Sequence, residues 1–411
     1  MTETRPMADQ HCLLDDNLQP LWMFLRHNGL LPDFCRPSVE IRAGYIARLG
    51  ITFIAVVLVL IMSLFLIVQL FRAKHVLDIM KISYNLVISL SAIFFQYQYL
   101  VNRNEYMKFC QDWRNIEIQF LPSRATDNRK IVTKLVYSFY LIILIADPLV
   151  IYIWNVNKPD DILFYSSHSW AGESLNLYFL SSFEAISVYY SFLYFYMGEL
   201  VPALFYHHAG GAIESIDSEF RDTFLNGGSD GSPPEVDGPA DPNWSNSQPR
   251  IATSISTIWE KYETILGFVN RANRLFGASI LCHNLTGFLL RSISVYCILK
   301  FNEDFVSIAL KLIFINITAV EIMRTVVVNR LMSHLRFARE QLLVSIAALM
   351  SQRWHRLPLE DRNHLMAFQT RLFNKDLAAS PFDLYTVNPS NLLSTLSLIV
   401  TYIIVLLQID I

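Results

Sequence analysis

The feature that most constrains this chain is a series of seven apolar runs, each long enough to cross a lipid bilayer. A hydrocarbon core of about 30 Å takes roughly 20 apolar helical residues to cross. Hydrophobic residues make up 53% of the chain and charged residues only 17%, whereas soluble domains carry about 25% charged residues. The sequence therefore predicts an all-α, polytopic membrane protein with seven transmembrane helices. The runs cover residues 45–71, 76–101, 131–155, 175–205, 275–299, 305–332 and 390–408.

The distribution of Lys and Arg predicts the orientation of these helices. Basic residues gather before the first run, between Arg103 and Lys130, and between residues 336 and 375, whereas the alternate loops carry few. Cytoplasmic loops are the ones enriched in Lys and Arg. We therefore expect a cytosolic N-terminus and an extracellular C-terminus, which is the inverse of the topology of G-protein-coupled receptors.

The chain is predicted to divide into four parts. Residues 1–44 form a cytosolic N-terminal segment, and residues 45–332 form a six-helix ligand-binding bundle. Within the bundle, residues 209–249 are rich in Gly, Ser, Pro and acidic residues, a composition that predicts a disordered cytosolic loop. This loop either serves as a solvated linker or binds a partner. A cytosolic helix follows over residues 250–274.

The remaining two parts are cytosolic anchor helices over residues 333–383 and a pore-lining seventh helix over residues 384–411. Apolar residues spaced by three and four, such as Ile255, Ile258, Tyr262 and Ile265, indicate packed helical seams in the cytosolic helices. Long cytosolic helix extensions of this kind can pack within one chain or against identical copies. The sequence is compatible with both.

The last apolar run carries a polar face. Polar groups are unfavourable in hydrocarbon unless protein or water satisfies them. Several copies of such a helix around a symmetry axis could enclose a water-filled path. Alternatively, the hydroxyl groups bond to their own helix or to a neighbouring helix. The face consists of Asn391, Ser394, Thr401 and Gln408, with Leu398 and Val405 between them.

The same run contains Thr401-Tyr402, five hydrophobic residues and then Gln408, which resembles the tail motif of the insect gustatory receptors. Ile409 stands where that family usually has phenylalanine. The resemblance implies a ligand-gated, non-selective cation channel that detects a chemical tastant in the plasma membrane of chemosensory neurons. It also implies a tetramer, formed alone or with other gustatory receptor subunits. The pore and gate residues it implies are Ser394, Thr401, Tyr402, Val405, Gln408 and Ile409.

A tastant pocket is expected in the outer half of the bundle, where aromatic surface meets a few polar groups. The fourth run is rich in aromatic residues, and charges inside spans require partners or water. An ion pair between Asp147 and Arg291 that only fixes packing is the alternative to ligand contact by Asp147. The candidate ligand-binding residues are Asn85, Asp147, Tyr178, Phe179, Phe183, Glu184 and Asn316.

Other classes of function find little support. The five cysteines have no spacing typical of zinc ligands or of a disulfide framework. The chain contains no catalytic motif, and we expect no enzyme activity, cofactor or metal site. The net charge of −3 gives no sign of a nucleic-acid partner. A secondary transporter and an odorant-receptor channel subunit are the alternatives that use similar helices.

Overall fold

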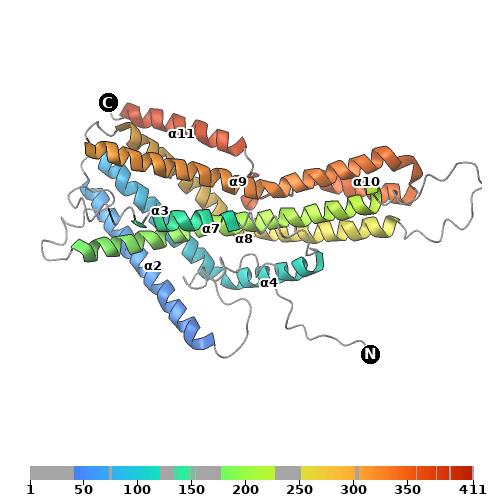
Figure 1. Ribbon diagram of the computed structural model, residues 1–411, viewed down its shortest axis with the longest axis horizontal. Coiled ribbons are helices and arrows are strands. Elements are labelled where there is room, and N and C mark those ends of the chain that lie inside the picture. Colours follow the sequence, from blue (N-terminus) through green and yellow to red (C-terminus); the bar gives the residue numbers. More distant parts are fainter. Residues whose placement is uncertain are drawn as a thin grey trace, which may run out of the picture.

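The computed structural model describes twelve parts of the chain. Within them every regular element is a helix, and the helices form an elongated bundle (Figure 1). The described residues are 41–73, 76–120, 134–136, 138–146, 148–149, 153, 177–226, 251–300, 305–357, 359–375, 377–387 and 390–409.

The helices of the first half are α2 (Ile41–Arg72), α3 (Val76–Val101), α4 (Arg103–Phe120) and α7 (Leu177–Arg221), which ends in the π-helical turn η3 (Asp222–Asn226). The second half contains α8 (Ile251–Lys300), α9 (Phe305–Arg353), the short 3-10 turn η5 (Trp354–Arg356) and α10 (Leu359–Asn374). It closes with the 3-10 turn η6 (Pro381–Asp383) and α11 (Ser390–Ile409).

The molecule is built around three long helices, α7, α8 and α9. They contain 45, 50 and 49 residues, so at 1.5 Å per residue each is roughly 65–75 Å long. This length is about twice the thickness of a hydrocarbon core. The helices run side by side along the long axis of the molecule (Figure 1). Each is therefore long enough to cross a membrane and to extend well beyond it.

The helical seam predicted before the fifth apolar run is part of α8. Ile255, Ile258, Tyr262 and Ile265 are all buried. The predicted cytosolic helix and the fifth run form one uninterrupted helix, because no proline or exposed glycine pair separates them.

The prediction of a disordered loop beginning at residue 209 is wrong for residues 209–226, which continue α7 and form η3. Ile213, Ile216 and Phe220 are buried at helical spacing. The acidic residues lie between them, and Glu219 pairs with Lys261 of α8 at 2.6 Å. The acidic composition of the whole segment concealed this amphipathic helix. Residues 227–249 lie outside the described part.

Helix α4 follows the second apolar run and was not predicted. Its apolar residues Tyr106, Phe109 and Trp113 are buried, and the rings of Phe109 and Trp113 pack on Phe205 of α7. The α4 carboxylate of Asp112 accepts a hydrogen bond of 2.7 Å from Arg271 of α8. Helix α4 thus braces α7 and α8 from one side.

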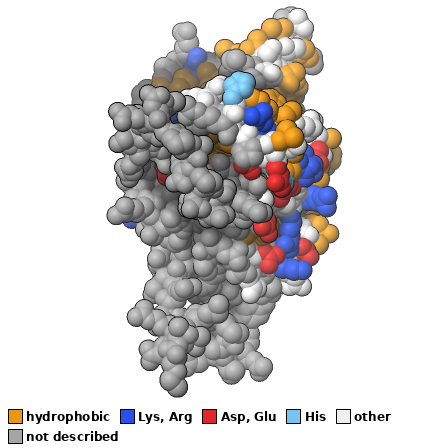
Figure 2. Space-filling model, turned by 90° about the vertical axis from the view of Figure 1, so that its right-hand side faces the viewer, with side chains coloured by type: hydrophobic (Ala, Val, Ile, Leu, Met, Phe, Trp, Pro, Cys, Tyr) orange, Lys and Arg blue, Asp and Glu red, His pale blue; other side chains and the backbone are white. Residues whose placement is uncertain are grey.

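Charged side chains gather at the end of the molecule that carries α10 (Figure 2). Arg371 of α10 forms an ion pair with Glu263 of α8 at 2.5 Å. The segments Phe53–Arg72 and Lys311–Gln352 are long and apolar enough to cross a membrane.

Candidate functional site

Helix α11 carries the predicted polar face, a stripe that contains Ser394, Thr401 and Gln408. Ile399 and Ile403 are buried, with exposed fractions of 5% and 8%, and α11 packs on α8. At about 100° per residue, Ser394, Thr401 and Gln408 fall on the opposite side of the helix from these two isoleucines. All three are exposed in the single chain. The polar stripe therefore faces away from the bundle.

The hydroxyl group of Thr401 also donates a hydrogen bond of 3.0 Å to the carbonyl oxygen of Ser397. The hydrogen-bonding capacity of this hydroxyl is therefore used within its own helix, which is one of the two alternatives that the sequence left open. Val405 is exposed beside the stripe, and the ring of Tyr402 contacts Phe288 of α8 at 6.0 Å between centroids. The side chain of Ile409 lies outside the described part.

Two of the candidate ligand-binding residues, Asn85 of α3 and Glu184 of α7, are buried, and Phe183 packs against the core. Asn316 is exposed on α9 of the single chain. Asp147 lies outside the described residues, and so do the side chains of Tyr178 and Phe179.

Hydroxyl groups line the contacts between α3, α7 and α8. Ser91 and Thr286 lie 2.7 Å apart across α3 and α8, and Ser89 and Ser191 lie 3.4 Å apart across α3 and α7. Small hydroxyl residues allow helices to approach closely in a membrane and bond across the contact. These positions were not predicted as a group, because each serine or threonine alone is unremarkable in a sequence.

Aromatic rings accompany the hydroxyl groups. Tyr190 and Tyr194 stack on α7 with centroids 6.4 Å apart, and Tyr84 of α3 meets Phe314 of α9 edge-on at 6.1 Å. Aromatic surface with a few polar groups is the usual lining of a small-molecule site. Aromatic rings and paired hydroxyl groups thus lie close together where α3, α7, α8 and α9 meet.

A charged network lies deeper in the bundle. Counted from the first residue of α7, Glu184 is roughly 10 Å along the helix and Glu199 roughly 33 Å. Arg324 of α9 has an exposed fraction of 0%, and its guanidinium donates to the carboxylates of Glu199 and Glu321. Buried charges persist in an apolar interior only when paired in this way.

Three further groups complete the network. Tyr140 donates a hydrogen bond of 2.9 Å to Glu199, and His283 of α8 contacts both Glu199 and Arg324. The guanidinium also lies over the rings of Phe195 and Tyr196, 4.9 and 5.3 Å from their centroids. Such cation–π contacts strengthen when water is excluded. The network ties α7, α8 and α9 together.

Arg291 is buried near this network, and its guanidinium donates to the hydroxyl of Thr325. The proposed ion pair with Asp147 is not tested, because Asp147 lies outside the described residues. Glu199, His283, Glu321 and Arg324 were missed by sequence reasoning. A charged or titratable side chain inside an apolar run was the signal that could have identified each of them. The pairing between helices is not visible in the sequence.

A family model described as 7tm chemosensory receptor matches residues 18–411. The chain belongs to this family. The receptor is accordingly a membrane protein, and the predicted all-α, polytopic fold and insect chemoreceptor membership are confirmed.

Solved structures similar to the receptor include the insect olfactory receptor OR5 from Machilis hrabei, with a TM-score of 0.70 and 13% sequence identity. The match covers 96% of this chain and 98% of that one. The same protein in complex with eugenol matches with a TM-score of 0.68, 14% identity and the same coverage. At this identity the likeness shows a shared fold. A comparison with curated protein sequences finds no match.

Proposed function

We propose that the receptor is a gustatory receptor that acts as a ligand-gated, non-selective cation channel. The observation that carries this proposal is the α11 stripe, which is polar, exposed and turned away from α8. The stripe contains Thr401 and Gln408, which are also the polar ends of the gustatory tail motif. Periodicity and motif therefore select the same surface.

The channel is formed by several copies of the chain. One polar-striped helix cannot enclose water, whereas four copies about an axis can, with Ser394, Thr401 and Gln408 lining the path and Tyr402, Val405 and Ile409 near its outer end. The anchor end also exposes large apolar residues that a partner subunit would cover. These include Phe337, Val344, Leu359, Met366 and Phe373. The partner is an identical subunit or another gustatory receptor subunit.

The charged end that carries α10 lies in the cytosol. Ion pairs such as Arg371–Glu263 and Arg336–Glu340 are placed there, and Lys and Arg are enriched in cytoplasmic segments. This orientation puts residues 1–44 inside and the end of α11 outside. The receptor then resides in the plasma membrane of chemosensory neurons, with the anchor helices of residues 333–383 beneath it.

The tastant binds in the outer half of the bundle, above the charged network. Asn85 and Glu184 are buried there on α3 and α7, and the Ser91–Thr286 contact supplies hydroxyl groups. Phe183, with Tyr178, Phe179 and Asp147, contributes to the same wall. Asn316 takes part only if a ligand or partner subunit reaches its exposed position on α9.

An odorant-receptor-type channel is the second candidate. The similar solved structures are of an olfactory receptor, one of them in complex with eugenol. The gustatory tail motif in α11 favours the first candidate. A secondary transporter is the third alternative, since buried charges such as Glu199 and Arg324 also occur in ion-coupled transport.

Whole-cell recording from cells that express the chain alone distinguishes these candidates. The panel contains sugars, bitter compounds, cuticular hydrocarbons and phenolic odorants including eugenol. Currents evoked by a tastant support the gustatory channel, and currents evoked only by volatile odorants support the olfactory one. Solute uptake without current supports the transporter and contradicts the proposal.

A further inference from the structure

The segment that joins α10 to α11 is built into the bundle. In this linker, defined as residues 377–387, Leu377, Ala379 and Val387 are buried. The backbone N–H of Val387 donates a hydrogen bond of 2.8 Å to the carbonyl oxygen of Ala379, which closes the linker into a loop. Because the linker connects the two helices, a movement of α11 relative to α10 has to displace or distort this packed loop.

Asn273 of α8 holds the linker with its side-chain amide. Its Nδ2 donates to the carbonyl oxygen of Ala378 at 3.1 Å, and its Oδ1 accepts the backbone N–H of Ser380 at 3.0 Å. The same Oδ1 accepts the hydroxyl of Tyr206 of α7 at 2.6 Å. Both acceptor positions of the Asn273 oxygen are thus used. One side chain therefore joins α7, α8 and the linker.

A second contact lies one turn along α8. A Cβ atom at Gly277 would lie 3.1 Å from the backbone nitrogen of Phe382, so the absence of a side chain permits the close approach. Phe382 and Asp383 have φ angles of 52° and 59°, values that residues other than glycine rarely adopt. The docked linker is consequently held in an unfavourable backbone conformation.

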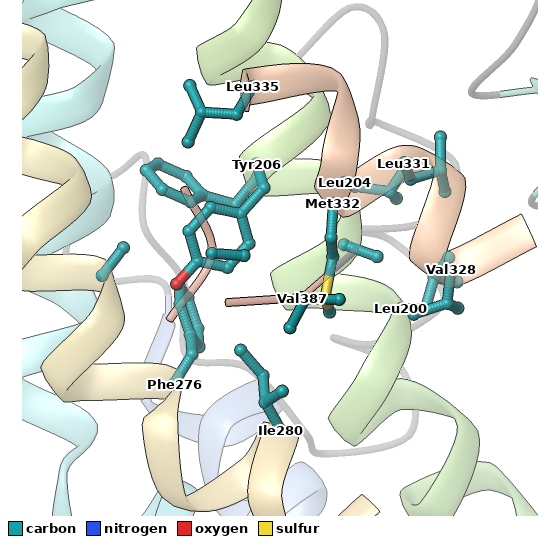
Figure 3. Close-up of a cluster of buried hydrophobic side chains, with 14 of the residues drawn as sticks. Leu200, Leu204, Tyr206, Phe276, Ile280, Val328, Leu331, Met332, Leu335 and Val387 are labelled. Carbon is teal, nitrogen blue, oxygen red and sulfur yellow. The ribbon is translucent and has the colours of Figure 1, made fainter. Parts of the chain in front are cut away.

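The linker also contributes to the core where α7, α8 and α9 meet. Figure 3 shows Val387 among side chains of these helices, with Leu200, Ile280 and Met332 around it. Farther along α8, the amide of Asn284 donates to the hydroxyl of Tyr385. Asn273, Gly277, Ile280 and Asn284 share one face of α8 at helical spacing.

We propose that Asn273 is a positioning residue that couples movement of α7 to movement of α11 through the linker. Tyr206 lies on the same helix as Glu184, so a ligand that shifts α7 acts on the Asn273 amide. Release of the amide lets the linker leave its unfavourable conformation and frees the start of α11. This inference rests on the proposed function, in which α11 lines the pore.

Hydrogen exchange measured by mass spectrometry on the full chain in lipid nanodiscs tests the coupling without any ligand. Tyr206→Phe removes only the hydroxyl that bonds Asn273 and keeps the buried ring. We expect amide exchange in residues 377–398 to rise about five-fold, the factor that corresponds to loss of one net hydrogen bond. Asn273→Ala, which removes all three bonds, raises exchange further.

Tyr106→Phe is the matched control. It removes another buried tyrosine hydroxyl, on α4. This hydroxyl donates to the carbonyl oxygen of Leu275 at 3.5 Å, on α8 like Asn273, and does not contact the linker. Exchange in residues 377–398 should stay unchanged in this variant. An equal rise in Tyr106→Phe and Tyr206→Phe, or no rise in Tyr206→Phe, overturns the proposal even if Asn273→Ala fails to fold.

Single-channel recording without ligand gives the second readout. Tyr206→Phe should raise the fraction of time open about three- to five-fold and leave the conductance unchanged, because Tyr206 lies outside the pore helix. Increased exchange with an unchanged open fraction overturns the coupling. If the unmodified protein gives no current under any condition, the proposed function fails, and the exchange in residues 390–398 alone decides whether α7 and α11 are joined.

Discussion

Arg324 offers the sharpest test of the buried charged network. Its guanidinium is fully buried and bonds Glu199 of α7 and Glu321 of its own helix. Arg324→Met keeps a long apolar side chain but leaves both carboxylates without their cation. Removing one partner of a buried ion pair generally costs about 3–5 kcal/mol in the free energy of unfolding.

The structure indicates that Arg324→Met lies toward the upper end of that range. Two carboxylates lose a partner at once, and the contacts of the guanidinium with the rings of Phe195 and Tyr196 are lost as well. Arg324→Lys keeps the charge, but a single ammonium cannot reproduce the planar fork that reaches both carboxylates. We expect an intermediate loss for the lysine variant.

Unfolding in mixed detergent micelles, with fluorescence-detected size exclusion as a check on folding, measures these differences. Arg324→Met combined with Glu321→Gln removes one uncompensated charge, and it should recover about 1–3 kcal/mol of the loss. A stability of Arg324→Met within about 0.5 kcal/mol of the unmodified chain refutes the reasoning. So does a double variant that is less stable than the single one.

Two further predictions concern the parts of α7 and α8 that lie near α10. Gly210→Ala should lower the free energy of unfolding by about 1–3 kcal/mol, because the new Cβ would lie 2.5 Å from Nδ1 of His334. In Gly267→Ala nothing lies within 4 Å of the new Cβ. Thermal unfolding of this variant should show a gain in stability of about 0.5–1 kcal/mol. Equal effects of the two variants contradict the close contact between α7 and α9. Hydrogen bonds from Arg371 lower the pKa of Glu263, so this pair stabilises the fold above the unfolded pKa of about 4.3 and the contribution is lost as the pH falls through the folded pKa. The difference in thermal stability between the unmodified chain and Glu263→Gln should therefore shrink below about pH 4, and a difference that grows on acidification opposes the assignment.

Much of the helical framework was predictable from periodicity. The seam that contains Ile255 and Tyr262 repeats apolar residues every three or four positions, and this pattern alone places one buried face on α8. The exposed polar face of α11 was equally visible from the spacing of Ser394, Thr401 and Gln408. Local spacing determines such faces, so a single sequence is sufficient to find them.

Contacts between distant segments were not predictable in the same way. The pairing of Glu199 with Arg324 joins residues 125 positions apart, and no local pattern relates them. The linker contact of Asn273 likewise depends on how α8 meets a segment more than 100 residues later. Residues 209–226 were misassigned because averaged composition hid an amphipathic face that includes Ile213, Ile216, Phe220 and Phe224.

We expect the polar stripe of α11 to face water in a pore. Cysteine accessibility tests it by comparing Thr401→Cys with Val400→Cys, two exposed neighbours about 100° apart on the helix. Each variant is recorded before and after a charged, water-soluble thiol reagent. We expect the reagent to block current through Thr401→Cys and to leave current through Val400→Cys unaffected. Block of Val400→Cys alone, or of neither variant in channels that conduct, contradicts this expectation.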